Sequence, residues 1–81
     1  MENSMEFEKL QEIIADVLPV DKREITMDSK FQDDLGADSL DVFQIIVGIE
    51  DAFALEIDTD EAEKIVTVGD AVEQIRNATN N

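Results

Sequence analysis

The 81-residue chain contains no cysteine, no histidine, no tryptophan and no tyrosine. Without cysteine it forms neither a disulfide nor a thiolate metal site, so any thiol chemistry must arrive on a cofactor. Without histidine it lacks the commonest general base and the commonest transition-metal ligand. Four phenylalanines are its only aromatic residues. Its core must therefore consist mainly of isoleucine, valine and leucine.

Positive charge is also scarce. The chain has six lysine and arginine residues and 21 aspartate and glutamate residues, which gives a formal net charge of −15. Such a negative field repels nucleic acid and anionic lipid and attracts basic protein surfaces. Hydrophobic residues nevertheless make up 43% of the chain, too many for a disordered acidic tail. We expect one domain over residues 1–81.

No hydrophobic run is long enough to span a membrane, and the acidic segment 1–7 is unlike a signal or transit peptide. These absences predict a cytoplasmic protein without a membrane span, which we expect to be monomeric and to bind no nucleic acid.

Hydrophobic residues recur at steps of three and four, as in amphipathic helices. The pattern predicts an all-α fold, a four-helix bundle with a long first loop and a short third helix. The first helix would be capped by Ser4, or by Asn3 with Glu6, and ended by Pro19. We expect the helices at about residues 4–18, 39–53, 59–65 and 68–77, with residues 77–81 frayed.

The first loop, between Pro19 and Asp38, is longer than most loops in compact domains and must pack some of its own side chains on the bundle. The candidates are Val20, Ile25, Met27, Phe31 and Leu35. The short third helix is marginal alone. It would depend for anchoring on Ala62, Ile65 and Val66.

The start of the second predicted helix carries the most informative local pattern. Asp38 is an N-cap residue type, and Asp41 follows three residues later, as in a capping box. Ser39 is then the first helical residue, with a short side chain at the surface. The adjacent N–H groups and the positive end of the helix dipole favour an attached anion such as phosphate. Ser39 is therefore the candidate functional residue.

This helix carries two apolar faces. The predicted core face consists of Val42, Ile45, Ile46, Ile49 and Phe53. A second stripe of Leu40, Phe43 and Val47 lies roughly 100° away around the helix. Either both faces are core, or the second stripe is an exposed interface for basic partners. The acidic rim of such an interface would be Asp38, Asp41, Glu50 and Asp51.

Residues 34–41, with Asp38-Ser39-Leu40 at their centre, resemble the prosthetic-group attachment site of acyl carrier proteins. The resemblance continues through residues 50–53, 60–65 and 67–72. It implies that a phosphopantetheinyl transferase (holo-ACP synthase) moves 4'-phosphopantetheine from coenzyme A to the Ser39 hydroxyl, with Asp38 and Leu40 beside it. Acyl intermediates would travel as thioesters on the thiol of that arm, and the protein would be a carrier and not an enzyme.

The resemblance also implies that acyl-chain synthesising and transferring enzymes dock through basic surfaces on the second helix. The implied contact residues are Asp38, Leu40, Asp41, Phe43, Gln44, Val47, Glu50 and Asp51. Fatty acid biosynthesis is the expected pathway. The alternatives are a polyketide, aminoacyl or specialised lipid pathway, or an acidic helical interaction module without a prosthetic group.

Two residues depart from the commoner family pattern. Gln44 stands where the resemblance predicts a glutamate, which removes one charge from the partner face. Gly48 costs the helix about 1 kcal/mol relative to alanine. It indicates either close packing or a helix that flexes.

Metal binding and serine catalysis are not expected. In an EF-hand calcium loop with Gly36 at the sixth position, Phe31 falls at the first, where aspartate is required. A loop starting at Asp58 puts Glu63 sixth and Gly69 twelfth, which fails as well. A serine triad cannot be assembled without histidine.

Overall fold

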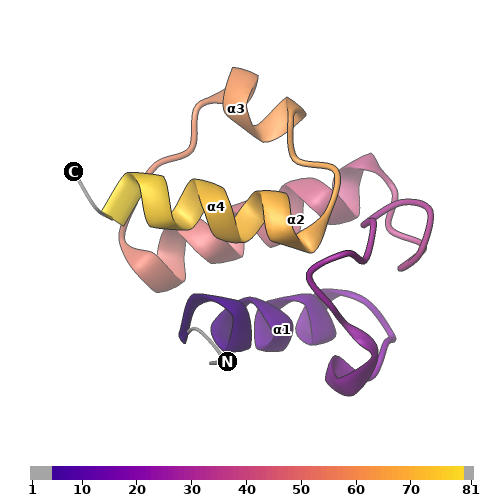
Figure 1. Cartoon of the computed structure of the whole chain (residues 1–81). Coiled ribbons are helices and arrows are strands. Elements are labelled where there is room, and N and C mark those ends of the chain that lie inside the picture. The colour runs from indigo at the N-terminus through magenta and orange to yellow at the C-terminus, as the bar shows by residue number, and fades with distance from the viewer. Residues whose placement is uncertain (1–4, 80–81) are drawn as a thin grey trace.

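A computed structural model describes residues 5–79 of the chain. Four α-helices follow one another, with one 3-10 turn in the first loop (Figure 1). They are α1 (Met5–Val17), η1 (Lys22–Glu24), α2 (Ser39–Phe53), α3 (Thr59–Glu63) and α4 (Val68–Thr79). Within the described part of the chain, the sole β-type pairing is an isolated bridge between Lys30 and Thr67. The all-α four-helix prediction is confirmed.

The helix ends differ from the predicted ones at three places. α1 ends at Val17, one residue early, and α3 ends at Glu63 instead of residue 65. The N–H groups of Lys64 and Ile65 bond three residues back, at 3.1 and 3.2 Å, which tightens the last turn of α3. α4 continues to Thr79, so the expectation of fraying from residue 77 is wrong as far as residue 79. The predicted caps at Asn3 and Ser4 lie outside the described residues.

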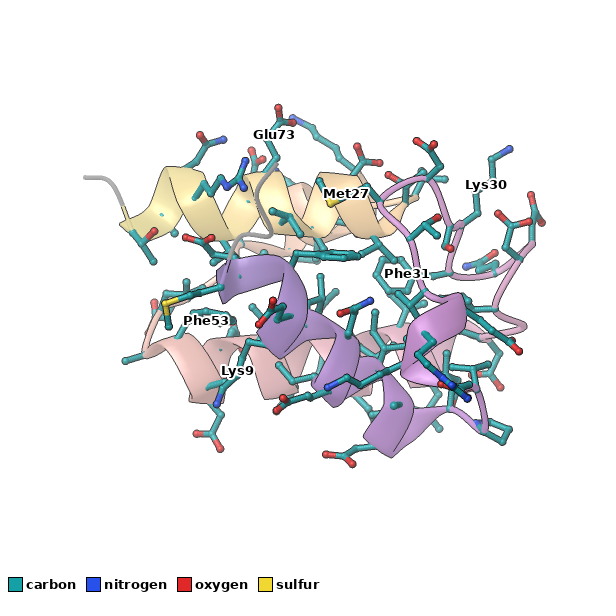
Figure 2. All side chains as sticks on the ribbon, turned by 60° about the horizontal axis from the view of Figure 1, so that its bottom comes forward. Lys9, Met27, Lys30, Phe31, Phe53 and Glu73 are labelled. Atoms are coloured by element: carbon teal, nitrogen blue, oxygen red, sulfur yellow. The ribbon has the colours of Figure 1, made fainter. Side chains whose placement is uncertain are left out.

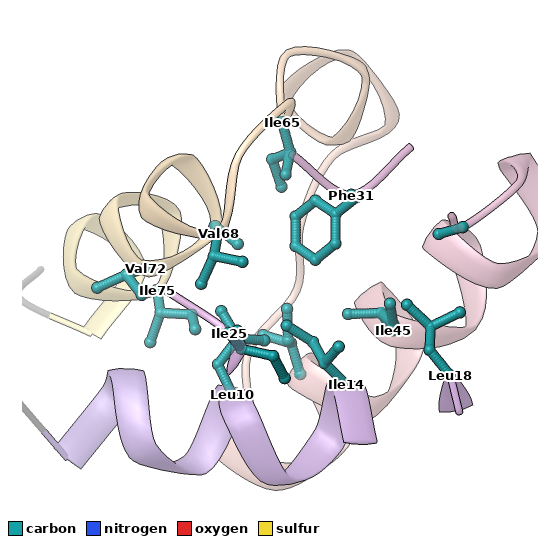
Figure 3. Close-up of a cluster of buried hydrophobic side chains, with 13 residues drawn as sticks. Leu10, Ile14, Leu18, Ile25, Phe31, Ile45, Ile65, Val68, Val72 and Ile75 are labelled. Carbon is teal, nitrogen blue, oxygen red and sulfur yellow. The ribbon is translucent and has the colours of Figure 1, made fainter. Parts of the chain in front are cut away.

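The core lies between α1, α2 and α4 and is almost entirely aliphatic (Figure 3). Each of these helices contributes residues spaced three or four apart, which places them on one face. The fully buried helical side chains include Leu10, Ile14, Ile45, Ile49, Val68, Val72 and Ile75.

The first loop packs three of its side chains into this core, Ile25, Phe31 and Ala37. Ile25 and Phe31 are buried, as predicted. Figure 2 shows Phe31 pointing inward, whereas Lys30, one residue earlier, points away from the bundle. Val20 and Leu35 are half-buried. Met27 is exposed, so its predicted packing role is wrong.

The same loop caps the start of α4, because its carbonyl oxygens accept hydrogen bonds from the first turn of that helix. The N–H groups of Val68 and Gly69 donate to the carbonyl oxygens of Ser29 and Met27, at 2.9 and 2.8 Å. These N–H groups belong to the first turn of α4, where no intrahelical acceptor exists. A Cβ atom at Gly69 would lie 3.0 Å from the Met27 carbonyl oxygen. Glycine therefore allows the loop to approach this closely.

α3 is the least embedded helix. None of its five residues is buried. Ile65, just beyond it, is buried and Ala62 is half-buried, as expected of anchoring residues. Val66 is exposed and is not an anchor, contrary to the prediction. None of the helices within residues 5–79 has the length and apolar character needed to cross a membrane.

Candidate functional site

A compact turn precedes the candidate site. The Lys30 carbonyl oxygen accepts hydrogen bonds from the N–H groups of Asp34 and Leu35, at 2.9 and 3.0 Å. The Asp34 carboxylate in turn accepts one from the Lys30 N–H, at 2.8 Å. Gly36 follows with a φ angle of 73°, in the left-handed region that favours glycine. The turn reverses the chain so that residue 37 returns to the bundle.

Ala37 joins this turn to the core. Its N–H donates to the carbonyl oxygen of Phe31 at 2.8 Å, and its own side chain is buried. The Phe31 ring is buried as well. Ala37, which precedes the N-cap residue, is therefore fixed both by its backbone hydrogen bond to Phe31 and by the burial of its side chain. The position of Asp38 is thus set by the core.

Asp38 and Asp41 form the predicted capping box at the start of α2. The Asp38 carboxylate accepts a hydrogen bond from the Asp41 N–H at 2.9 Å, and the Asp41 carboxylate accepts one from the Asp38 N–H at 3.3 Å. Both carboxylates thereby satisfy backbone donors that a helix start leaves open. The two side chains stabilise the first turn.

Ser39 is the first residue of α2, and it is exposed. Within the described residues, its hydroxyl takes part in no side-chain hydrogen bond. The Ser39 and Leu40 N–H groups lie in the first turn, where no carbonyl four residues back is available. A Cβ atom added to Gly36, three residues earlier, would meet nothing within 4 Å, so the space beside Gly36 is open. A hydroxyl here can take an anionic group and leave it in solvent.

The chain has no histidine that could act as the base for this hydroxyl. The carboxylates of Asp38 and Asp41 each accept a backbone hydrogen bond.

The two apolar faces of α2 differ in burial. Ile45, Ile46 and Ile49 are buried on the core face, and Val42 and Phe53 are half-buried. On the second stripe, 65% of Leu40, 62% of Phe43 and 45% of Val47 is exposed. Of the two alternatives for the second stripe, core or exposed face, the structure supports the exposed face.

The polar residues around this stripe are not equivalent. Asp38, Gln44 and Asp51 are exposed, and Asp41 is half-buried. Glu50 is half-buried as well, and its carboxylate accepts a hydrogen bond from the Ile57 N–H at 2.8 Å. Glu50 is thus engaged within the fold, which sequence reasoning missed because its partner lies beyond the end of the helix.

A cavity of about 180 Å³ lies beside Val42 and was also missed. Its walls come from three segments far apart in the sequence, so no local sequence pattern predicts the cavity. They are Phe31, Gln32 and Asp33 of the first loop, Val42 of α2, and Glu63, Ile65 and Val66 around the end of α3. Among the described residues, no group of three or more histidine, cysteine or acidic side chains is arranged to hold a metal ion.

Comparison with known proteins identifies the family. The model of the family described as "Phosphopantetheine attachment site" matches residues 8–75. An acyl carrier protein of Clostridium acetobutylicum is 51% identical over 72 residues, which span 89% of this chain and 94% of that protein. The chain belongs to the acyl carrier protein family. A solved structure, of the acyl carrier protein from Enterococcus faecalis, superposes with a TM-score of 0.76 at 36% identity, covering 90% of this chain and 92% of that one.

Membership of this family gives the general function. The protein is a carrier with covalently attached 4'-phosphopantetheine and is not an enzyme. Acyl carrier proteins act by interacting with synthases and transferases, so binding to enzymes belongs to the role of the chain.

Proposed function

We propose that Ser39 is the attachment residue and that the protein carries the acyl intermediates of fatty acid biosynthesis. The observation that carries the proposal is the exposed hydroxyl of Ser39 at the capped start of α2. Ser29, the neighbouring serine along the chain, is buried, and its hydroxyl accepts a hydrogen bond from the Thr26 N–H at 3.0 Å. It offers no comparable attachment point.

In this proposal Asp38 and Asp41 have a structural and an electrostatic role. Their reciprocal hydrogen bonds keep the first turn of α2 formed, so the Ser39 oxygen is presented in a fixed place. The first-turn N–H groups and the helix dipole stabilise negative charge attached at that oxygen. In this proposal the transferase supplies the base that removes the hydroxyl proton, because this chain has no histidine. The bound group supplies the thiol on which acyl chains are held as thioesters.

The exposed stripe of α2 is the proposed docking face for enzymes. Leu40, Phe43 and Val47 form its apolar centre, with Gln44 beside them. Asp38 and Asp41 supply negative charge at one end and Asp51 at the other. Positions 41 and 51 lie ten residues apart, which corresponds to about 15 Å along a helix. A complementary partner would present an apolar patch between two basic groups.

Three further parts of the proposal concern the protein as a whole. Residues 1–81 form a single carrier domain, the protein is monomeric, and it acts in the cytoplasm. The C. acetobutylicum relative, matched over 94% of its length, supports the single domain.

The pathway is tested by reconstitution. The protein, loaded with its prosthetic group, is supplied with malonyl and acetyl donors and with purified bacterial fatty acid synthesis enzymes. We expect it to accept a malonyl group and to accumulate lengthened acyl chains, detected by mass. A loaded protein that the malonyl transferase and the condensing enzymes ignore would assign it to another carrier pathway.

A further inference from the structure

Lys30 lies between the start of α4 and the turn that precedes the candidate site. On one side it forms an isolated antiparallel bridge with Thr67. The hydrogen bonds of this bridge join the flanking residues, from the Phe31 N–H to the Val66 carbonyl oxygen at 3.0 Å and from the Val68 N–H to the Ser29 carbonyl oxygen at 2.9 Å. In this pattern Lys30 and Thr67 are a non-hydrogen-bonded pair. The N–H and C=O groups of Lys30 therefore point to the opposite edge, toward the turn.

Asp34 bonds to both of these backbone groups. Its carboxylate accepts a hydrogen bond from the Lys30 N–H at 2.8 Å, and its own N–H donates to the Lys30 carbonyl oxygen at 2.9 Å. The side chain of Lys30 points away from the bundle in Figure 2, so the backbone of this residue joins the turn to the fold. A hydrogen bond to an ionised carboxylate is stronger than one between neutral groups. The Asp34 side chain thus makes a strong attachment of the turn.

The turn itself has little buried surface to hold it in place. Its two ends, Phe31 and Ala37, are buried and are joined by a hydrogen bond from the Ala37 N–H to the Phe31 carbonyl oxygen at 2.8 Å. Of the residues between them, Leu35 is half-buried and the others are exposed. Segments with so few buried contacts depend on their hydrogen bonds for a fixed conformation. The conformation of the turn that leads to Ser39 therefore depends on Lys30 and Asp34.

We propose that Asp34 is a positioning residue for attachment of the prosthetic group. Its bond to Lys30 fixes the turn beside Ser39, and with it the orientation in which the Ser39 hydroxyl meets the transferase. The proposal rests on the proposed function, since it takes Ser39 as the attachment residue. The Asp34 carboxylate is bonded to Lys30 and not to the capping residues of α2, so its effect on Ser39 runs through the backbone of the turn.

The alternative is that Asp34 acts through its charge alone, as one more acidic group near a basic partner. Asp33 is the matched control, because it is the adjacent residue, is also exposed and carries the same charge. Only the carboxylate of Asp34 accepts the hydrogen bond from the Lys30 N–H. Loss of charge weakens binding and does so less at high salt. Loss of positioning instead slows the transfer step inside the complex.

The test is single-turnover transfer of phosphopantetheine from coenzyme A to the unmodified full-length protein, at increasing concentrations of phosphopantetheinyl transferase. The saturating rate reports transfer within the complex, and the half-saturating concentration reports binding. Asp34→Ala removes both the charge and the acceptor, whereas Asp34→Asn keeps a carbonyl oxygen that can accept the same hydrogen bond. Asp33→Ala removes a charge only.

We expect the saturating rate to fall about tenfold in Asp34→Ala, to fall less in Asp34→Asn and to stay unchanged in Asp33→Ala. The two alanine variants should weaken binding alike, and high salt should remove that difference from the original protein but not the difference in saturating rate. Amide hydrogen exchange checks the same bond without the transferase. The Lys30 amide should exchange faster in Asp34→Ala and not in Asp33→Ala, with the buried amides of α1 unchanged.

Ser39→Ala, measured in the same assay, separates the two proposals. Modification that persists in it would overturn the attachment site and the role of Asp34 together. If Ser39→Ala is not modified, equal saturating rates for Asp34→Ala and Asp33→Ala would overturn the role of Asp34 alone. A loss in Asp34→Ala that is confined to the half-saturating concentration would do the same, because it would show an effect of charge.

Discussion

Gly48 of α2 lies directly against Ile13 of α1, since a Cβ atom at Gly48 would be only 2.9 Å from Ile13 Cγ2. Carbon atoms do not approach this closely without something moving. The sequence left open whether this glycine serves close packing or helix flexibility. The contact favours close packing, which brings two core helices together at the cost of some helix propensity.

Replacing Gly48 with alanine should therefore destabilise the protein. The gain in helix propensity is about 1 kcal/mol, and overpacking typically costs about 1–3 kcal/mol. We expect a net loss of about 1 kcal/mol in the free energy of unfolding, measured with urea. The double variant with Ile13→Ala should lose less than the sum of the single variants. A more stable Gly48→Ala protein would show that Ile13 moves aside at little cost.

Phe43 and Phe31 provide a matched pair for the exposed stripe of α2. Phe43 is exposed and Phe31 is buried. Phe43→Ala should change the free energy of unfolding by no more than about 0.5 kcal/mol, whereas Phe31→Ala should cost about 3–5 kcal/mol. If Phe43 contacts partners, its variant should also be modified more slowly by a phosphopantetheinyl transferase. A large stability loss in Phe43→Ala would place its ring in the core, and an unchanged modification rate would remove it from the docking face.

The Asp70 carboxylate contributes to the free energy of unfolding by an amount that depends on pH. Hydrogen bonds from the Thr67 and Val66 N–H groups lower the pKa of its carboxyl in the folded protein. A lowered folded pKa means that the stabilisation is complete above the unfolded pKa, about 4, and is lost as the pH falls through the folded pKa. The stability difference between the original protein and Asp70→Asn should therefore be constant near neutrality and shrink below about pH 4. Urea unfolding from pH 7 downward measures it, and a difference independent of pH would contradict the assignment.

The predictions that succeeded depend on residues close in sequence. The capping box of Asp38 and Asp41 spans one helical turn, so the sequence alone reveals it. Met27 and Val66 were misplaced because apolar character does not tell which side of an irregular segment faces the core. The hydrogen bond from Ile57 to Glu50 joins residues on either side of Ala54, whose left-handed backbone conformation alanine rarely adopts. No sequence pattern predicts this hydrogen bond.

The central claim, that Ser39 takes the prosthetic group, is tested most directly by intact mass. The original protein, Ser39→Ala and Thr59→Ala are each incubated with coenzyme A, magnesium and a broad-specificity phosphopantetheinyl transferase. Thr59 is the matched control, because it is also an exposed hydroxyl residue at the first position of a helix. We predict a gain of one phosphopantetheine in the original protein and in Thr59→Ala, and none in Ser39→Ala. A gain that persists in Ser39→Ala, or no gain in an original protein shown to be folded, would contradict the claim.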